Sequence, residues 1–217
     1  MNNILIILIR EFRADYRNPY LLSGAGLFMV ASVFVAYTAI RRVHEIPVWV
    51  ALYWLVALFT AFNAISRSFM YESRGRMMYW FTLVKPVQYI LAKSIYHILV
   101  MALLGAIGAV IYITLFPLKV EDVVMFCVSI LLGSTALGSV LSLFGSIASK
   151  AGGNFTLLAI LGLPVLLPVL MVATTLMKNS IDGLDWSVQW KYLIVLAGLN
   201  VVSLGLSVLL FPYLWRE

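Results

Sequence analysis

The sequence predicts an all-α membrane protein with six transmembrane helices, and three observations support that prediction. Of the 217 residues, 63% are hydrophobic and 11% are charged, and the mean hydropathy is +1.02. A soluble domain is about half apolar and about a quarter charged. The apolar residues gather in six runs, each close to the roughly 20 residues that a helix needs to cross a bilayer. Runs of this length are about twice as long as the strands of a transmembrane barrel, which excludes that fold.

Residues 1–18 are expected to form an amphipathic helix that lies in the membrane interface. The apolar run Ile4–Ile9 is too short to span a bilayer. Basic residues follow this run, whereas a signal peptide carries them before it. One helical face holds Leu5, Leu8, Ile9, Phe12 and Tyr16, and another holds Arg10, Arg13 and Arg17. This separation of faces is typical of an interfacial helix, and Asn18-Pro19 is expected to end it.

The whole chain, residues 1–217, is expected to form one permease domain, with both termini in the cytoplasm. The predicted spans are Leu21–Ile40, Val48–Ile65, Ile95–Phe116, Val123–Ile147, Phe155–Met177 and Leu193–Leu214. With the N-terminus inside, ten lysines and arginines fall on the cytoplasmic side and five on the outer side. Inner loops carry such an excess, although the outer pair Arg41-Arg42 departs from the rule. The aromatic residues near span ends are expected to anchor at the headgroup level: Trp49, Tyr53, Trp54, Trp186, Trp190 and Trp215.

The segment 66–94 is the long interval in which charged residues interrupt the apolar runs. Its apolar positions Met70, Met77, Phe81 and Val84 follow roughly helical spacing, which predicts a short amphipathic helix. Proline suits the first position of the helix that comes next, because its missing donor is not needed there. We expect this segment to lie at the cytoplasmic surface, either as a docking site for a soluble partner or as an interfacial loop. The docking residues would be Glu72, Gly75, Met77, Trp80, Phe81 and Pro86.

Two spans carry patterns with structural meaning. In the fourth, small residues recur every four positions at Ser134, Gly138, Ser142 and Ser146. Such a stripe lets another helix approach closely, either within the chain or across a dimer. In the fifth, Gly162, Pro164 and Pro168 predict a kink or break, since each proline removes a helical hydrogen bond. Broken helices in membranes often lie beside a pathway or a moving element, so a pathway at this kink is the expectation.

Motifs for catalysis, metals and ATP are missing from the sequence. There is no G-x-x-x-x-G-K-[ST] loop, so energy for any transport must come from a separate ATP-binding subunit. There is no H-E-x-x-H motif, and the lone cysteine, Cys127, lies in an apolar run. We therefore expect no catalytic residue and no bound metal. His44 and His97 are candidate haem ligands or simple polar anchors. The net charge of +6 comes without a basic face, which argues against nucleic acid as a partner.

Taken together, these features resemble those of the CcmB family, the permease subunit of the ABC transporter in bacterial cytochrome c maturation. The resemblance covers nearly the whole length. It rests on Glu72, Gly75, Pro86 and Leu91-Ala92-Lys93, on Leu132–Gly138, on Lys150–Gly153 and on Leu163–Pro168. It implies an ABC-2-like permease in the bacterial inner membrane, without catalysis of its own. ATP would be bound by a partner ATPase, haem is the candidate substrate, and haem-handling C and D subunits are the further partners implied.

The alternatives differ in their partners. An ABC-2-type permease for a lipid or a drug has the same architecture, and the genes of cytochrome c maturation nearby would separate it from a haem exporter. A membrane scaffold has no ATPase partner, so co-purification of an ATPase would exclude it. A homodimer is a further candidate assembly, through close packing of small residues. Within the haem exporter, a mechanical role and a haem conduit both stay open.

Overall fold

A computed structural model describes residues 3–17, 20–40, 45–70, 84–150 and 155–214, and every regular element among them is a helix. The helices are α1 (Asn3–Arg17), α2 (Tyr20–Ile40), α3 (Ile46–Met70), α5 (Pro86–Leu115), α6 (Val123–Lys150), α7 (Phe155–Ile181) and α8 (Trp186–Leu214). In this part of the chain, six helices are long and apolar enough to cross a membrane. The chain is therefore a multi-pass membrane protein, as its composition predicts.

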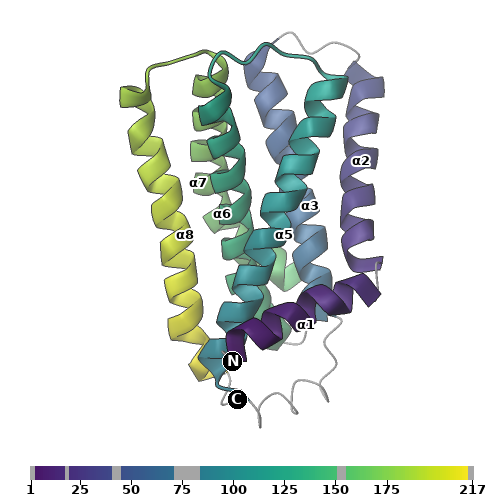
Figure 1. Cartoon of the computed structure of the whole chain (residues 1–217), viewed down its shortest axis with the longest axis vertical. Coiled ribbons are helices and arrows are strands. Elements are labelled where there is room, and N and C mark those ends of the chain that lie inside the picture. The colour runs from purple at the N-terminus through teal and green to yellow at the C-terminus, as the bar shows by residue number, and fades with distance from the viewer. Residues whose placement is uncertain (1–2, 18–19, 41–44, 71–83, 151–154, 215–217) are drawn as a thin grey trace.

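The six spans run alongside one another, and α1 lies across one end of the bundle, close to α2 and α5 (Figure 1). α6 is the central helix, because it packs against α3, α5, α7 and α8. Most of its residues are buried, whereas α2 and α8 expose apolar side chains along much of their length. In a membrane these exposed faces meet lipid, where an apolar surface carries no penalty.

Several helices extend beyond the predicted spans. α5 begins at Pro86, the predicted helix start, and therefore extends before the membrane span predicted from Ile95. α3 continues to Met70, so both ends of the segment 66–94 are helical. α6 continues to Lys150, α7 continues to Ile181 and α8 begins at Trp186. Hydropathy falls where polar residues begin, but the helical hydrogen bonds continue through them. For this reason the apolar run marks the membrane core and not the whole helix.

Local signals fix the helix ends at the side opposite α1. The carboxylate of Asp122 accepts a hydrogen bond from the backbone N–H of Met125 at 2.9 Å, which caps the first turn of α6. The other oxygen of Asp122 accepts a 2.7 Å hydrogen bond from the indole of Trp186, the first residue of α8. Gly183 has φ of +68°, a left-handed conformation that suits glycine after the end of α7. These contacts join the α5–α6 connection to the α7–α8 turn.

Three aromatic residues near the start of α3 do not lie at the lipid headgroups as predicted. Trp49, Tyr53 and Trp54 are all buried. The indole of Trp49 donates to the backbone oxygen of Phe116 at 3.1 Å, and the hydroxyl of Tyr112 donates to the backbone oxygen of Trp49 at 3.1 Å. These hydrogen bonds join the start of α3 to the end of α5. The rings form an aromatic cluster inside the bundle, in which Trp49 and Tyr53 each donate a hydrogen bond to a backbone oxygen of another segment. The indole nitrogen of Trp54 is buried without a hydrogen-bond partner among the described residues.

Candidate functional site

The predicted docking segment enters the described structure only at its two ends. Glu72, Gly75, Met77, Trp80 and Phe81 lie outside the described residues. Pro86 is the first residue of α5, and it follows an extended Lys85 with φ of −67° and ψ of 140°. The backbone oxygen of Lys85 accepts hydrogen bonds from two N–H groups in the first turn of α5. Pro86 therefore starts a helix, which is the local role predicted for it.

A buried lysine lies where α3 and α5 meet at the α1 end of the bundle. Lys93 of α5 is 1% exposed. Its ammonium group donates to the backbone oxygen of Ser68 at 3.4 Å and to the hydroxyl of Tyr89 at 3.3 Å. It also lies 4.4 Å from the centre of the Phe69 ring, a distance at which a cation is attracted to an aromatic face. A buried charge in a membrane protein needs such partners and commonly marks a functional site.

One helical turn further along α5, a buried histidine connects three helices. His97 is 2% exposed. Its Nε2 lies 2.9 Å from the hydroxyl of Ser68 in α3, and its Nδ1 lies 3.0 Å from the hydroxyl of Ser142 in α6. The Ser142 hydroxyl is also 3.1 Å from the hydroxyl of Ser94. Both ring nitrogens of His97 are thus engaged, so neither is available to ligate haem iron in this conformation. We call Ser68, Lys93, Ser94, His97 and Ser142 the polar network.

The packing around the polar network depends on a glycine that the sequence patterns do not single out as a packing position. A Cβ atom on Gly145 of α6 would lie 2.6 Å from the ring of Phe69. Phe69 is buried, and its ring centre is 5.2 Å from that of His97. The missing side chain of Gly145 lets the end of α3 pack flat on α6. Because the partner of this glycine is distant in sequence, no local pattern could reveal it.

The small-residue stripe of α6 faces α5 within the same chain. A Cβ atom on Gly138 would lie 3.0 Å from the backbone oxygen of His97. Ser134 lies against Gly105, and Ser142 belongs to the polar network. Ser146 is also buried, but its hydroxyl donates to Leu143 in its own helix at 2.6 Å. The close approach that the stripe predicts is therefore an intramolecular contact between α5 and α6.

The amphipathic helix α1 packs on α5 beside the polar network. Ile7 is buried, and the rings of Phe12 and Tyr96 meet edge to face with centres 5.1 Å apart. Burial, with a smaller contribution from the charge of Glu11, raises the pKa of Asp15 to about 6, while the charge of Lys93 acts in the opposite direction. Because the protonated carboxyl suits this position, the contact of α1 gains stability as pH falls from about 6 toward the ordinary value of 3.8.

The prolines of the fifth predicted span lie inside a helix without interruption. α7 continues through both Pro164 and Pro168, so the span is not broken, and the kink stays a prediction. Both prolines are exposed on the outside of the bundle, whereas Gly162 is buried against Leu141 of α6. A pathway lined by these prolines would therefore run along the outer face of the chain. The prolines and the polar network are separate features.

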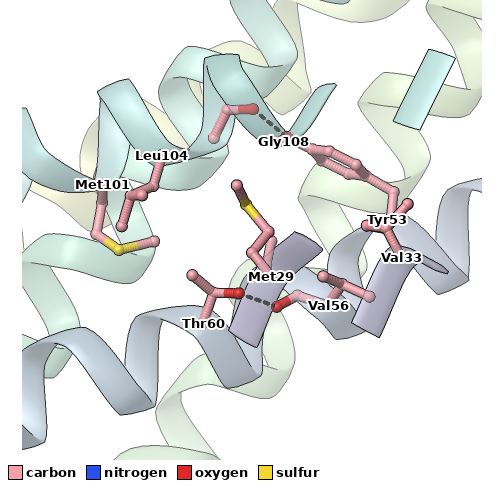
Figure 2. A pocket seen from close by; sticks show the side chains of 10 residues that line it. Met29, Val33, Tyr53, Val56, Thr60, Met101, Leu104 and Gly108 are labelled. Atoms are coloured by element: carbon pink, nitrogen blue, oxygen red, sulfur yellow. Dashed lines mark hydrogen bonds between the residues drawn. The ribbon is translucent and has the colours of Figure 1, made fainter. Parts of the chain in front are cut away.

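A small apolar cavity lies between α2, α3 and α5 (Figure 2). Its lining residues are Met29, Val33, Tyr53, Val56, Ala57, Thr60, Met101, Leu104, Gly105 and Gly108. The hydroxyl of Tyr53 donates to the backbone oxygen of Gly105 at 2.9 Å, and that of Thr60 donates to Val56 at 2.8 Å. The volume of about 10 Å³ suits one water molecule, whereas pockets for organic ligands hold roughly 300–1,000 Å³. The cavity cannot hold a porphyrin in this conformation.

The remaining polar candidates are placed as follows. Asn200 of α8 donates to the backbone oxygen of Leu132 in α6 at 3.3 Å, so a neighbouring helix satisfies it. Asn63 bonds to Phe59 in its own helix. Among the described residues no group of three or more histidines, cysteines or acidic residues could hold a metal. His44 lies outside that part of the chain.

The sequence of this chain matches a known protein family and a curated relative. The model of the CcmB family, described as CcmB protein, matches residues 3–214. The match includes every predicted span and the whole of the polar network. The chain is similar in sequence to Heme exporter protein B of Pseudomonas aeruginosa, with 28% identity over 222 residues. The alignment covers 95% of this chain and 94% of the relative.

Proposed function

The chain belongs to the CcmB family, and from that premise we propose that it is the membrane permease subunit of a haem-exporting ABC transporter in cytochrome c maturation. The family match over residues 3–214 is the observation that carries this proposal. The chain contributes spans and a docking segment, while a separate subunit binds and hydrolyses ATP. A separate ATP-binding subunit is consistent with the sequence of this chain, which contains no phosphate-binding loop.

The geometry favours a mechanical role for this subunit. The polar network connects α3, α5 and α6 at the end from which the predicted docking segment leaves the bundle. The cavity between α2, α3 and α5 holds about 10 Å³, and both ring nitrogens of His97 are hydrogen-bonded, so neither this cavity nor this histidine accommodates haem in this conformation. Haem then passes at a surface shared with other subunits, for which the haem-handling C and D type subunits and a second copy of this chain are the proposed partners.

The proposed location is the bacterial inner membrane with both termini in the cytoplasm. The excess of lysine and arginine in the inner segments supports this orientation. Asp182, in the turn before α8, then faces the periplasm, and Lys85, just before α5, faces the cytoplasm. Both residues are exposed.

Cysteine labelling tests the orientation. Cys127 is the single native cysteine, so Cys127→Ser provides the background for Asp182→Cys and for Lys85→Cys. A membrane-impermeant maleimide added to intact spheroplasts should label position 182 and leave position 85 unlabelled until the membrane is permeabilised. Labelling of position 85 from the outside would contradict the proposed topology.

Purification from native membranes tests the function. A tagged chain should retain an ABC ATPase subunit, and deletion of its gene should abolish covalent haem attachment to c-type cytochromes, with recovery on re-expression. Retention of an ATPase with normal c-type cytochromes would indicate a permease for another substrate, such as a lipid or a drug. Absence of any ATPase would indicate a membrane scaffold and would contradict the proposal.

A further inference from the structure

We propose that the polar network is the linkage that makes the ends of α3 and α5 move together with α6 when the partner ATPase acts on the docking segment. The residues assigned to this linkage are Ser68, Lys93, Ser94, His97 and Ser142. They are assigned as positioning residues, because they act through the helices that they join. The inference rests on the proposed function and assigns residues within it that transmit the motion.

The position of the network supports this role. Ser68 lies in the last turn of α3, and Lys93 lies within the first turns of α5. These two helices adjoin the predicted docking segment in the sequence, so a force on the segment acts first on their ends. Lys93 joins the two ends directly, because its ammonium group donates to the backbone oxygen of Ser68 at 3.4 Å. A displacement of one helix end therefore pulls on the other.

His97 then extends the linkage to the central helix. Its two ring nitrogens bridge the hydroxyls of Ser68 and Ser142, at 2.9 and 3.0 Å. Ser142 belongs to α6, the helix that also packs against α7 and α8. Through these two hydrogen bonds the end of α3 is connected to the helix that holds the rest of the bundle together. Packed side chains and hydrogen-bond networks carry coupling between distant sites, and these residues form such a network between α3, α5 and α6.

The chemistry of the site explains why the linkage is stiff. His97 is 2% exposed and Ser142 is 0% exposed, so water cannot replace a broken hydrogen bond at either residue. Elsewhere along the α5–α6 contact, Ser134 and Gly138 are small residues that let the two helices approach closely. The hydrogen bonds of Ser142 add a polar connection to this close packing and hold the ring of His97 within it.

Two substitutions separate transmission from folding. Ser142→Ala removes one hydroxyl and leaves room, and His97→Phe keeps a planar ring but removes both nitrogens. His97→Gln is the conservative variant, because its amide can still bond toward Ser68. Ser129→Ala is the matched control, since Ser129 is a buried serine of the same helix whose hydroxyl donates to the backbone oxygen of Phe126 within α6.

Each variant is produced in the full complex and measured for ATPase subunit retained, ATP hydrolysed and c-type cytochrome formed. We expect Ser142→Ala and His97→Phe to retain the ATPase within twofold of wild type while cytochrome formed per ATP falls about tenfold, the effect of losing a buried hydrogen bond. His97→Gln should recover part of the yield, and Ser129→Ala should match wild type.

The outcomes separate this inference from the proposed function. If cytochrome formation falls only in proportion to the complex assembled, or does not fall, the network is structural and the inference is wrong. If His97→Gln is as impaired as His97→Phe, hydrogen bonding is not the cause and the inference is also wrong. If wild type itself retains no ATPase, the proposed function fails together with this inference.

Discussion

Replacing Gly138 by leucine is expected to lower the accumulation of folded protein. A Cβ atom at this position of α6 would lie 3.0 Å from the backbone oxygen of His97 and 3.2 Å from the Cα of Ile98. Both are backbone atoms of α5, so no side-chain rotation can make room. Overpacking commonly costs about 1–3 kcal/mol and more where the backbone must move. A domain is stable by only about 5–15 kcal/mol, so a loss of this size lowers the folded fraction.

The matched control is Gly198→Leu on α8. Gly198 is exposed, and nothing lies within 4 Å of a Cβ atom built there. Leucine is a better helix former than glycine by up to about 1 kcal/mol, so this variant should fold as well as wild type or slightly better. The measurement is the yield of monodisperse protein in detergent, with the thermal unfolding midpoint. Equal yields for the two variants would contradict the tight α5–α6 contact.

The double variant Glu72→Arg with Phe81→Ala is expected to release the ATPase subunit. Both residues belong to the docking segment predicted from the sequence, outside the described residues. The proposed permease needs a contact whose free energy differs between the states of its ATPase. Truncating an aromatic anchor in such a contact commonly costs about 2 kcal/mol. That loss weakens binding about thirtyfold, before any repulsion from the reversed charge is added.

Tyr213→Ala is the control for this variant, because Tyr213 is an exposed aromatic residue near the end of α8 on the same side of the bundle. It should retain the ATPase at the wild-type level. The measurement is the amount of ATPase that co-purifies with equal amounts of folded permease, together with c-type cytochrome formed in cells. Wild-type retention by the double variant would place the docking surface elsewhere on the chain.

The sequence predicted the number and type of elements well, because a bilayer imposes a strong constraint on length and polarity. Each of the six apolar runs lies in a helix, and the amphipathic residues 3–17 form the helix that lies across one end. In the segment 66–94, polarity along the sequence does not predict which residues are buried. In the sequence, Lys93 and Ser94 belong to the polar segment that we expect at the membrane surface. In the structure both residues belong to α5 and are buried in the bundle. Their partners Ser68 and Ser142 are distant in sequence, and polarity alone does not reveal such partners.

Aromatic and small residues show the same division between local and tertiary information. The stripe from Ser134 to Ser146 predicted a close helix contact, but only the structure shows α5 of the same chain as the partner. Trp49 is near a span end, which predicts a headgroup anchor. It is buried because its indole reaches a backbone oxygen of α5. Hydropathy does not distinguish the headgroup level from the interior of the bundle for a tryptophan near a span end. The hydrogen bond from Trp49 to another segment favours the interior.

The sequence by itself determined that this protein has six apolar runs long enough to cross a membrane, that it contains no G-x-x-x-x-G-K-[ST] loop and that it resembles a permease family. These properties follow from composition and local motifs, which need no knowledge of neighbours. Only the tertiary structure decided that His97 bridges α3 and α6 and that Gly145 accommodates Phe69. The free energy of a buried polar or packed group depends on the atoms around it, and those atoms come from helices far apart in the chain.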